Sequence, residues 1–164
     1  MSSEPKVLNV LFVCLGNICR SPTAEAVFAD RVNAAGLGKR FRIDSAGTLS
    51  AHAGEMADAR MRKHSHARGY DLQSRSRKVT DEDFINFDTI IAMDLQNMQD
   101  LKDRAPDQVA SRKISLFLDA APHLHVREVP DPYYGGSAGF ENVLDLIEAA
   151  SDALLQKLTD EHHV

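Results

Sequence analysis

The chain has 164 residues, which suits one compact domain, and its 43% hydrophobic content is enough for a buried core. A net charge of −5 argues against a general binder of nucleic acids or anionic membranes, but leaves room for a local basic pocket. The first residues lack a secretion signal and no apolar run could span a bilayer, so we expect a cytoplasmic protein with reduced thiols.

The predicted elements alternate between strands and helices. An apolar, β-rich run at residues 7–13 predicts a buried parallel strand. We expect a helix next, with Ser21 as its N-cap, Pro22 at its first position and Gly36 after its end. Further along we expect strands at 41–45, 87–93 and 113–118, helices at 58–68 and 94–101, a helical turn at 81–84, and a C-terminal helix whose apolar face runs from Phe140 to Leu158.

This alternation predicts a single α/β domain over residues 1–164, with its core at about 6–160. It should be doubly wound, with a mostly parallel four-stranded sheet flanked by helices. In such sheets the ligand site lies at the carboxyl ends of the strands, which is where the first strand delivers Cys14.

Cys14 and Cys19 are the only cysteines, and both fall within the six residues that follow the first strand. A metal site, a structural crosslink and a reactive thiolate could each explain this placement. Two cysteines are too few for a structural zinc site, and the histidines do not complete one, so we expect no metal.

The loop between Cys14 and Arg20 has the residues of an anion-binding nest. Its backbone amides can point inward and the following helix adds its N-terminal amides, while Gly16 and Asn17 tolerate left-handed backbone angles. Arg20 can clamp two phosphate oxygens through its planar fork. The same donors would stabilise a Cys14 thiolate, to which Ser21 can add a hydrogen bond. These features indicate a phosphate-binding loop that holds a nucleophile.

The string from Cys14 to Pro22, CLGNICRSP, resembles the signature of the low-molecular-weight protein tyrosine phosphatases. The segments DSAGT (44–48), DAR (58–60), VTDEDFINFDTIIAMD (79–94) and DPYYGG (131–136) occur in the family's order, so the resemblance covers nearly the whole chain. It implies a cysteine-dependent phosphotyrosine phosphatase that needs no cofactor. The phosphate-binding residues that it implies are Leu15, Gly16, Asn17, Ile18, Cys19, Arg20 and Ser21.

The resemblance also implies the remaining catalytic groups. Asp131 before Pro132 reads locally as a turn, but it matches the family's general acid, on a loop that folds over the nucleophile. Asn17, Ser21 and Asp94 match supporting positions, and Asp94 is an equally good N-cap for the helix after it. The pair Asp58 and Arg60 reads as structural.

The expected pocket walls depart from the family's pattern on one side. Tyr133 and Tyr134 match tyrosines at the pocket mouth, where a phenyl ring could stack. On the other side Ala51 stands near the place of the usual aromatic, so Leu49 or His52 would form this wall. Ser74 stands where many members carry a histidine that supports the loop, and we expect altered tuning rather than lost activity.

Three other functions can be weighed against this one, and the chain lacks the further cysteines of the second and has all three groups that the third would lack. An apolar Ile18 favours phosphotyrosine, whereas the family branch that acts on phosphoarginine typically has threonine there. An arsenate reductase would need cysteines after Cys19, and a non-catalytic phosphate-binding module would be expected to lack Cys14, Arg20 or Asp131. Cys19 is either a small packing residue or a resolving thiol that forms a reversible disulfide with oxidised Cys14.

The resemblance also implies the binding partners. We expect a phosphotyrosine-containing protein as substrate and inorganic phosphate or a similar oxyanion in the loop. We expect no nucleic acid and no membrane span. The protein would be a monomer or a weak homodimer.

Overall fold

A computed structural model describes residues 6–133 and 135–164, and it is built around one sheet of four parallel strands. The strands are β1 (Leu8–Cys14), β2 (Phe41–Gly47), β3 (Thr89–Ala92) and β4 (Ile114–Leu116), in the spatial order β2-β1-β3-β4. β1 pairs with β2 over its whole length, so Cys14 lies opposite Gly47 at the carboxyl edge of the sheet. This arrangement confirms the expected parallel α/β domain.

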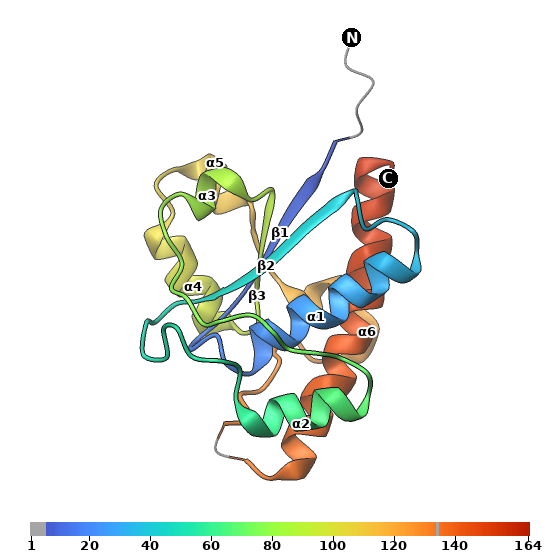
Figure 1. The fold of residues 1–164 in the computed structure, drawn as a ribbon. Coiled ribbons are helices and arrows are strands. Elements are labelled where there is room, and N and C mark those ends of the chain that lie inside the picture. The colour runs from blue at the N-terminus through green and yellow to red at the C-terminus, as the bar shows by residue number, and fades with distance from the viewer. Residues whose placement is uncertain (1–5, 134) are drawn as a thin grey trace.

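Helices cover both faces of the sheet (Figure 1). On one face α1 (Arg20–Ala34) packs against α6 (Ser137–His162), and α2 (Ala59–Ala67) joins α6 near its beginning. The other face is covered by α3 (Asp83–Asn86), α4 (Leu95–Arg104) and α5 (Gln108–Arg112). None of the helices in the described part of the chain is both long and apolar enough to cross a membrane.

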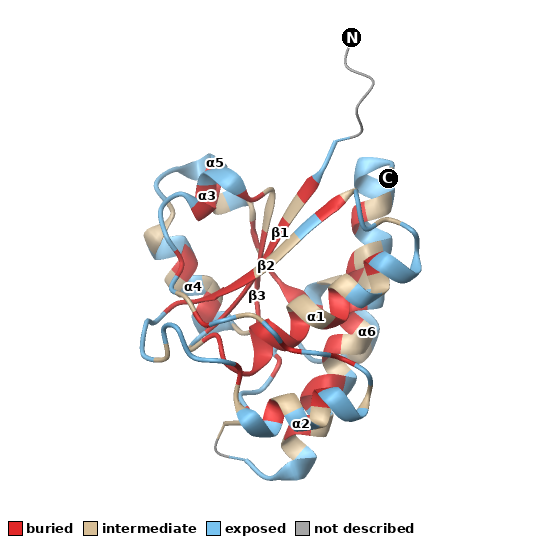
Figure 2. Cartoon of the chain, in the orientation of Figure 1, coloured by how far each residue is buried: buried red, intermediate tan, exposed pale blue. Residues whose placement is uncertain are grey.

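β1 is buried on both faces, as its continuous apolar run predicts (Figure 2). Val10 and Phe12 face the core beneath α1 and α6, whereas Leu11 and Val13 face the core beneath α4. Successive strand residues point to opposite faces, so Cys14 follows Val10 and Phe12 onto the α1 side. The edge of β1 therefore delivers the Cys14 side chain to the beginning of α1.

The beginning of α1 differs from the prediction. The helix starts at Arg20 with Cys19 as its N-cap, and no side chain caps it. Ser21 was expected at the cap but lies inside the first turn, where its hydroxyl contacts Cys14 and Asn17 instead of the helix amides. The amides at this helix end are consequently left free for a ligand.

Candidate active site

The phosphate loop, residues 14–20, joins β1 to α1 and directs its backbone oxygens outward. The carbonyl oxygen of Leu15 accepts from the Leu49 amide at 3.0 Å and that of Ile18 from the Asp58 amide at 2.8 Å. The Gly16 carbonyl accepts from the Ser76 hydroxyl at 2.9 Å. By contrast, the backbone amides of residues 15–20 donate no hydrogen bond to any group within residues 6–133 and 135–164. A row of unbonded amides beside a helix N-terminus is a ready anion site.

Asn17 holds the loop in its curled form. It has a left-handed backbone angle, φ 56°, which costs free energy that the surroundings must offset. Its side-chain amide donates to the hydroxyls of Ser21 at 2.8 Å and Ser45 at 3.0 Å, and its oxygen accepts from the Arg77 amide at 3.0 Å. Asn17 thus ties the loop to α1, β2 and the segment before α3.

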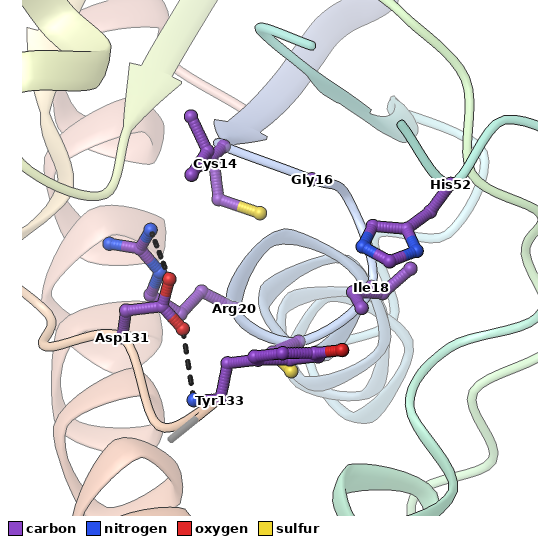
Figure 3. Close-up of a pocket in the computed structure, with 9 residues that line it drawn as sticks. Cys14, Gly16, Ile18, Arg20, His52, Asp131 and Tyr133 are labelled. Carbon is purple, nitrogen blue, oxygen red and sulfur yellow. Dashed lines mark hydrogen bonds and ion pairs between the residues drawn. The ribbon is translucent and has the colours of Figure 1, made fainter. Parts of the chain in front are cut away.

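Cys14 lies at the base of the loop with 3% of its surface exposed, and its sulfur points into the pocket (Figure 3). The Ser21 hydroxyl lies 3.0 Å from this sulfur. A Cβ atom on Gly47 would stand 2.8 Å from the Leu15 carbonyl oxygen, so the sheet edge can approach the loop only because Gly47 has no side chain.

Arg20 supplies a fixed positive charge beside the loop. Its guanidinium donates to the Asp94 carboxylate at 2.6 Å and to the Val129 carbonyl at 3.0 Å. Burial opposes the charged form, but the Cys14 thiolate and Asp94 more than offset this and raise the Arg20 pKa. Asp94 also caps α4, since it accepts from the Asn97 amide at 2.7 Å, and the predicted N-cap is therefore confirmed.

Asp131 stands at the open side of the pocket. Its carboxylate lies 3.7 Å from Arg20 and accepts from the Tyr133 amide at 3.0 Å (Figure 3). The pocket has a volume of about 190 Å³. The residues that line it are Cys14, Leu15, Gly16, Ile18, Cys19, Arg20, His52, Asp131 and Tyr133.

The two expected walls are only partly found. Tyr133 and His52 face each other across the mouth with ring centroids 6.2 Å apart, and His52 bonds Glu55 at 2.6 Å through its Nδ1. Leu49 does not line the described pocket: its side chain is exposed, and the residue meets the loop through its backbone amide. Tyr134 lies outside the described residues.

Arg60 has a role that the sequence reasoning missed. Its guanidinium binds both carboxylate oxygens of Asp58 and also donates to the Tyr133 carbonyl at 2.8 Å. It lies over the rings of Tyr133 and Phe140, at 5.4 and 4.9 Å from their centroids. The pair Asp58 and Arg60 thus connects the acid loop, residues 129–133, to the phosphate loop through the Asp58 amide. Only the DAR spacing pointed to this pair.

Glu25 is a second missed residue. Its carboxylate accepts from the Ser45 hydroxyl at 2.5 Å, and Ser45 in turn contacts Asn17 of the phosphate loop. Burial raises the Glu25 pKa, while hydrogen bonds from Ser45 and Ser74 oppose the shift.

The two cysteines differ in environment. Burial, then the charges of Asp58 and Cys14, raise the pKa of Cys19 to about 12, so Cys19 is a protonated thiol at neutral pH. Both cysteines are unpaired. Among the residues that the structure describes, no cluster of three metal-ligating side chains occurs.

The fold and site together define an α/β protein with a cysteine at the base of an anion-binding loop. The family model described as low molecular weight phosphotyrosine protein phosphatase matches residues 9–164, so the chain belongs to this family of cysteine-dependent phosphatases. It is 42% identical over 154 residues to the low molecular weight protein-tyrosine-phosphatase of Streptomyces coelicolor, covering 93% of this chain and 94% of the relative.

Two solved structures extend the comparison. A protein tyrosine phosphatase from Entamoeba histolytica, with Hepes in its active site, matches with a TM-score of 0.91 and 48% identity, covering 94% of this chain and 98% of that one. A Drosophila arginine phosphatase matches with a TM-score of 0.86 and 32% identity, covering 91% of this chain and 96% of that one.

Proposed function

We propose that this protein hydrolyses phosphotyrosine monoesters in proteins through a cysteinyl-phosphate intermediate. The observation that carries the proposal is the convergence of three groups on one small pocket. These are the Cys14 sulfur, the unbonded amides of the phosphate loop and the Arg20 guanidinium. Asp131 lines the same pocket, with its carboxylate 3.7 Å from the Arg20 guanidinium.

In the first step Cys14 attacks phosphorus in line with the ester oxygen. The loop amides and Arg20 stabilise the charge on the equatorial oxygens, so no metal ion is needed for this purpose. Asp131 gives a proton to the departing phenolate oxygen, and a well-placed acid accelerates such a step by roughly 10²–10⁴. The Ser21 hydroxyl, 3.0 Å from the sulfur, supports the thiolate.

In the second step water hydrolyses the cysteinyl-phosphate. Asp131, now a carboxylate, takes a proton from the attacking water, and Cys14 departs as a thiolate held by the same loop. Inorganic phosphate is released from the amides and Arg20. Asp94 acts as a positioning residue, because its 2.6 Å contact fixes the orientation of the guanidinium.

The pocket mouth supports phosphotyrosine as substrate. The Tyr133 ring and the His52 ring flank the opening, and Ile18 adds an apolar surface that a phenyl ring could contact. The similarity to the arginine phosphatase keeps phosphoarginine as the alternative substrate. The two unpaired cysteines fit a reducing compartment, and we propose a cytoplasmic monomer or weak homodimer.

The test is hydrolysis of p-nitrophenyl phosphate, phosphotyrosine and phosphoarginine in the presence of EDTA. We expect wild type to prefer phosphotyrosine, Cys14→Ser to be inactive, and Asp131→Asn to lose roughly 10²–10⁴ in kcat on esters with poor leaving groups. A folded wild type no faster than Cys14→Ser would contradict the proposal. A preference for phosphoarginine would replace the substrate but keep the mechanism.

A further inference from the structure

Positive charge is concentrated in one part of this acidic chain. The segment 56–78 contains seven lysine and arginine residues but only two aspartates, whereas the whole chain has a net charge of −5. The segment consists of α2 and the extended chain that follows it. The extended chain returns to the beginning of α2, where Arg75 forms an antiparallel bridge with Met56.

A hollow of about 500 Å³ lies between α2 and the returning chain. Arg62, Lys63 and His66 line it from α2, while Met56 and Leu72 give it apolar surface. The remaining lining residues are Ala59, Asp71 and Gln73. We call this hollow the basic groove. Its mixture of cationic and apolar side chains suits a peptide more than a bare polyanion.

Two cations that line the basic groove and a third beside it, at the Met56 bridge, lack an acidic partner. Across residues 6–133 and 135–164, no carboxylate oxygen lies within ion-pair distance of Arg62, Lys63 or Arg75. Within the described part of the chain, Arg62 donates only to the Ala57 carbonyl and Arg75 only to the Gly54 carbonyl. The other arginines of the segment form ion pairs within the protein: Arg60, Arg68 and Arg77. The three cations therefore remain available to an external anion.

Segments beside the basic groove contact the outer side of the phosphate loop, where its carbonyl oxygens point. Ser76, next to Arg75, donates to the Gly16 carbonyl at 2.9 Å. Asp58, next to Ala59, donates its amide to the Ile18 carbonyl at 2.8 Å. The pocket and the groove are therefore built on segments that meet at the same loop, and an extended substrate chain, which advances about 3.3 Å per residue, would connect them.

We propose that the basic groove binds an acidic segment of the phosphoprotein whose phosphotyrosine enters the catalytic pocket. This inference rests on the proposed function, because it assigns a feature of the substrate to that activity. Carboxylates of the segment pair with Arg62 and Lys63 in the groove and with Arg75 beside it, and its apolar side chains contact Met56 and Leu72.

The expected effect is on peptide affinity. An exposed ion pair contributes modestly, so two or three pairs should change KM by roughly threefold to tenfold, and salt should weaken the effect. Small substrates never reach the groove, so their kcat and KM should stay unchanged when the groove is altered.

The test compares three phosphotyrosine peptides, with an Asp/Glu run before the phosphotyrosine, after it, or absent. We expect one of the two acidic peptides, the one whose Asp/Glu run reaches the groove, to have a KM roughly threefold to tenfold below that of the neutral peptide. The double variant R62E/K63E should abolish this difference and leave p-nitrophenyl phosphate hydrolysis intact. The matched control is K39E/K157E, which makes the same charge change at exposed sites elsewhere.

The inference is overturned if neither acidic peptide is preferred, or if the control variant removes the preference equally. Fluorescence anisotropy with labelled peptides and Cys14→Ser protein gives an independent measurement, in which Arg75→Glu should weaken binding of the preferred acidic peptide. If wild type hydrolyses no phosphate ester, the proposed function fails, whereas the anisotropy result still supports or overturns the groove.

Discussion

At the scale of single residues, the buried Glu25 makes a prediction about stability and pH. Burial raises its pKa in the folded protein, so over the interval between the unfolded and folded pKa values the folded state holds more protons. Stability must therefore fall as pH rises through this interval. Above this interval the buried carboxylate is charged in both states, and its burial costs stability.

Glu25→Gln removes this charge while its amide oxygen can still accept from Ser45. We expect a higher free energy of unfolding than wild type at pH 7, with the difference shrinking as pH falls through the folded pKa. Urea titrations of both proteins between pH 4 and 8 measure it. Glu161→Gln, at an exposed position, is the control. A difference that does not vary with pH would contradict the argument.

A second prediction at this scale concerns Cys19 and the reversible oxidation of Cys14. Peroxide converts the Cys14 thiolate to a sulfenic acid, which can condense with the Cys19 thiol to a disulfide and water. The raised Cys19 pKa means that this thiol is protonated at neutral pH, so condensation should be slow there and accelerate as pH rises toward about 12. Dithiothreitol would reduce the disulfide and restore Cys14.

At alkaline pH, where more Cys19 is a thiolate, we expect peroxide-treated wild type to recover most of its activity under dithiothreitol and Cys19→Ser to recover much less, because its Cys14 oxidises further. Activity before and after reduction, with mass spectrometry of the Cys14 peptide, measures both. Equal recovery of the two proteins would reject the resolving role and leave Cys19 as a packing residue under the loop.

At the scale of elements, α2 positions the acid loop through Arg60. The contacts to the Tyr133 carbonyl and ring anchor residues 129–133, which carry Asp131. Arg60→Ala should release this anchor and lower kcat roughly tenfold for esters with poor leaving groups, which depend on protonation by Asp131. Esters with good leaving groups should change little. Arg60→Lys should rescue part of the loss.

Leaving-group dependence of kcat across substituted phenyl phosphates measures this effect. Arg62→Ala on the same helix is the matched control, because its guanidinium contacts the Ala57 carbonyl and not the acid loop. An equal loss for all esters would indicate a general disturbance of the fold and would count against a positioning role.

The elements also show what a sequence can and cannot predict. Strong apolar runs such as β1 and the apolar face of α6 were predicted because burial alone determines them. The beginning of α1 was predicted wrongly, because the Ser21 hydroxyl contacts the Cys14 sulfur and does not cap the helix. The short helix α5 carries no long apolar pattern and was missed. Cys14 and Arg20 lie in one contiguous motif, whereas Arg60 and Glu25 act through partners distant in the chain.

At the scale of the whole molecule, the active site is held by hydrogen bonds from many separate segments of the fold. The phosphate loop is bonded to the segment after β2, to the start of α2 and to the chain before α3. Arg20 in addition holds the beginning of α4 and the acid loop. An anion bound by this loop should therefore stabilise the entire domain and not only the pocket.

We expect inorganic phosphate to raise the melting temperature. A ligand at about 100 times its Kd stabilises the folded state by about 2.7 kcal/mol, which in a chain of this size corresponds to roughly 5–10 °C. Arg20→Ala should abolish most of the increase, whereas Arg127→Ala, at an exposed ion pair with Asp119, should keep it. Differential scanning calorimetry over a phosphate series measures the effect. An undiminished increase in Arg20→Ala would mean that phosphate stabilises the protein from another site, and the phosphate loop would lose its assigned role as the anion cradle.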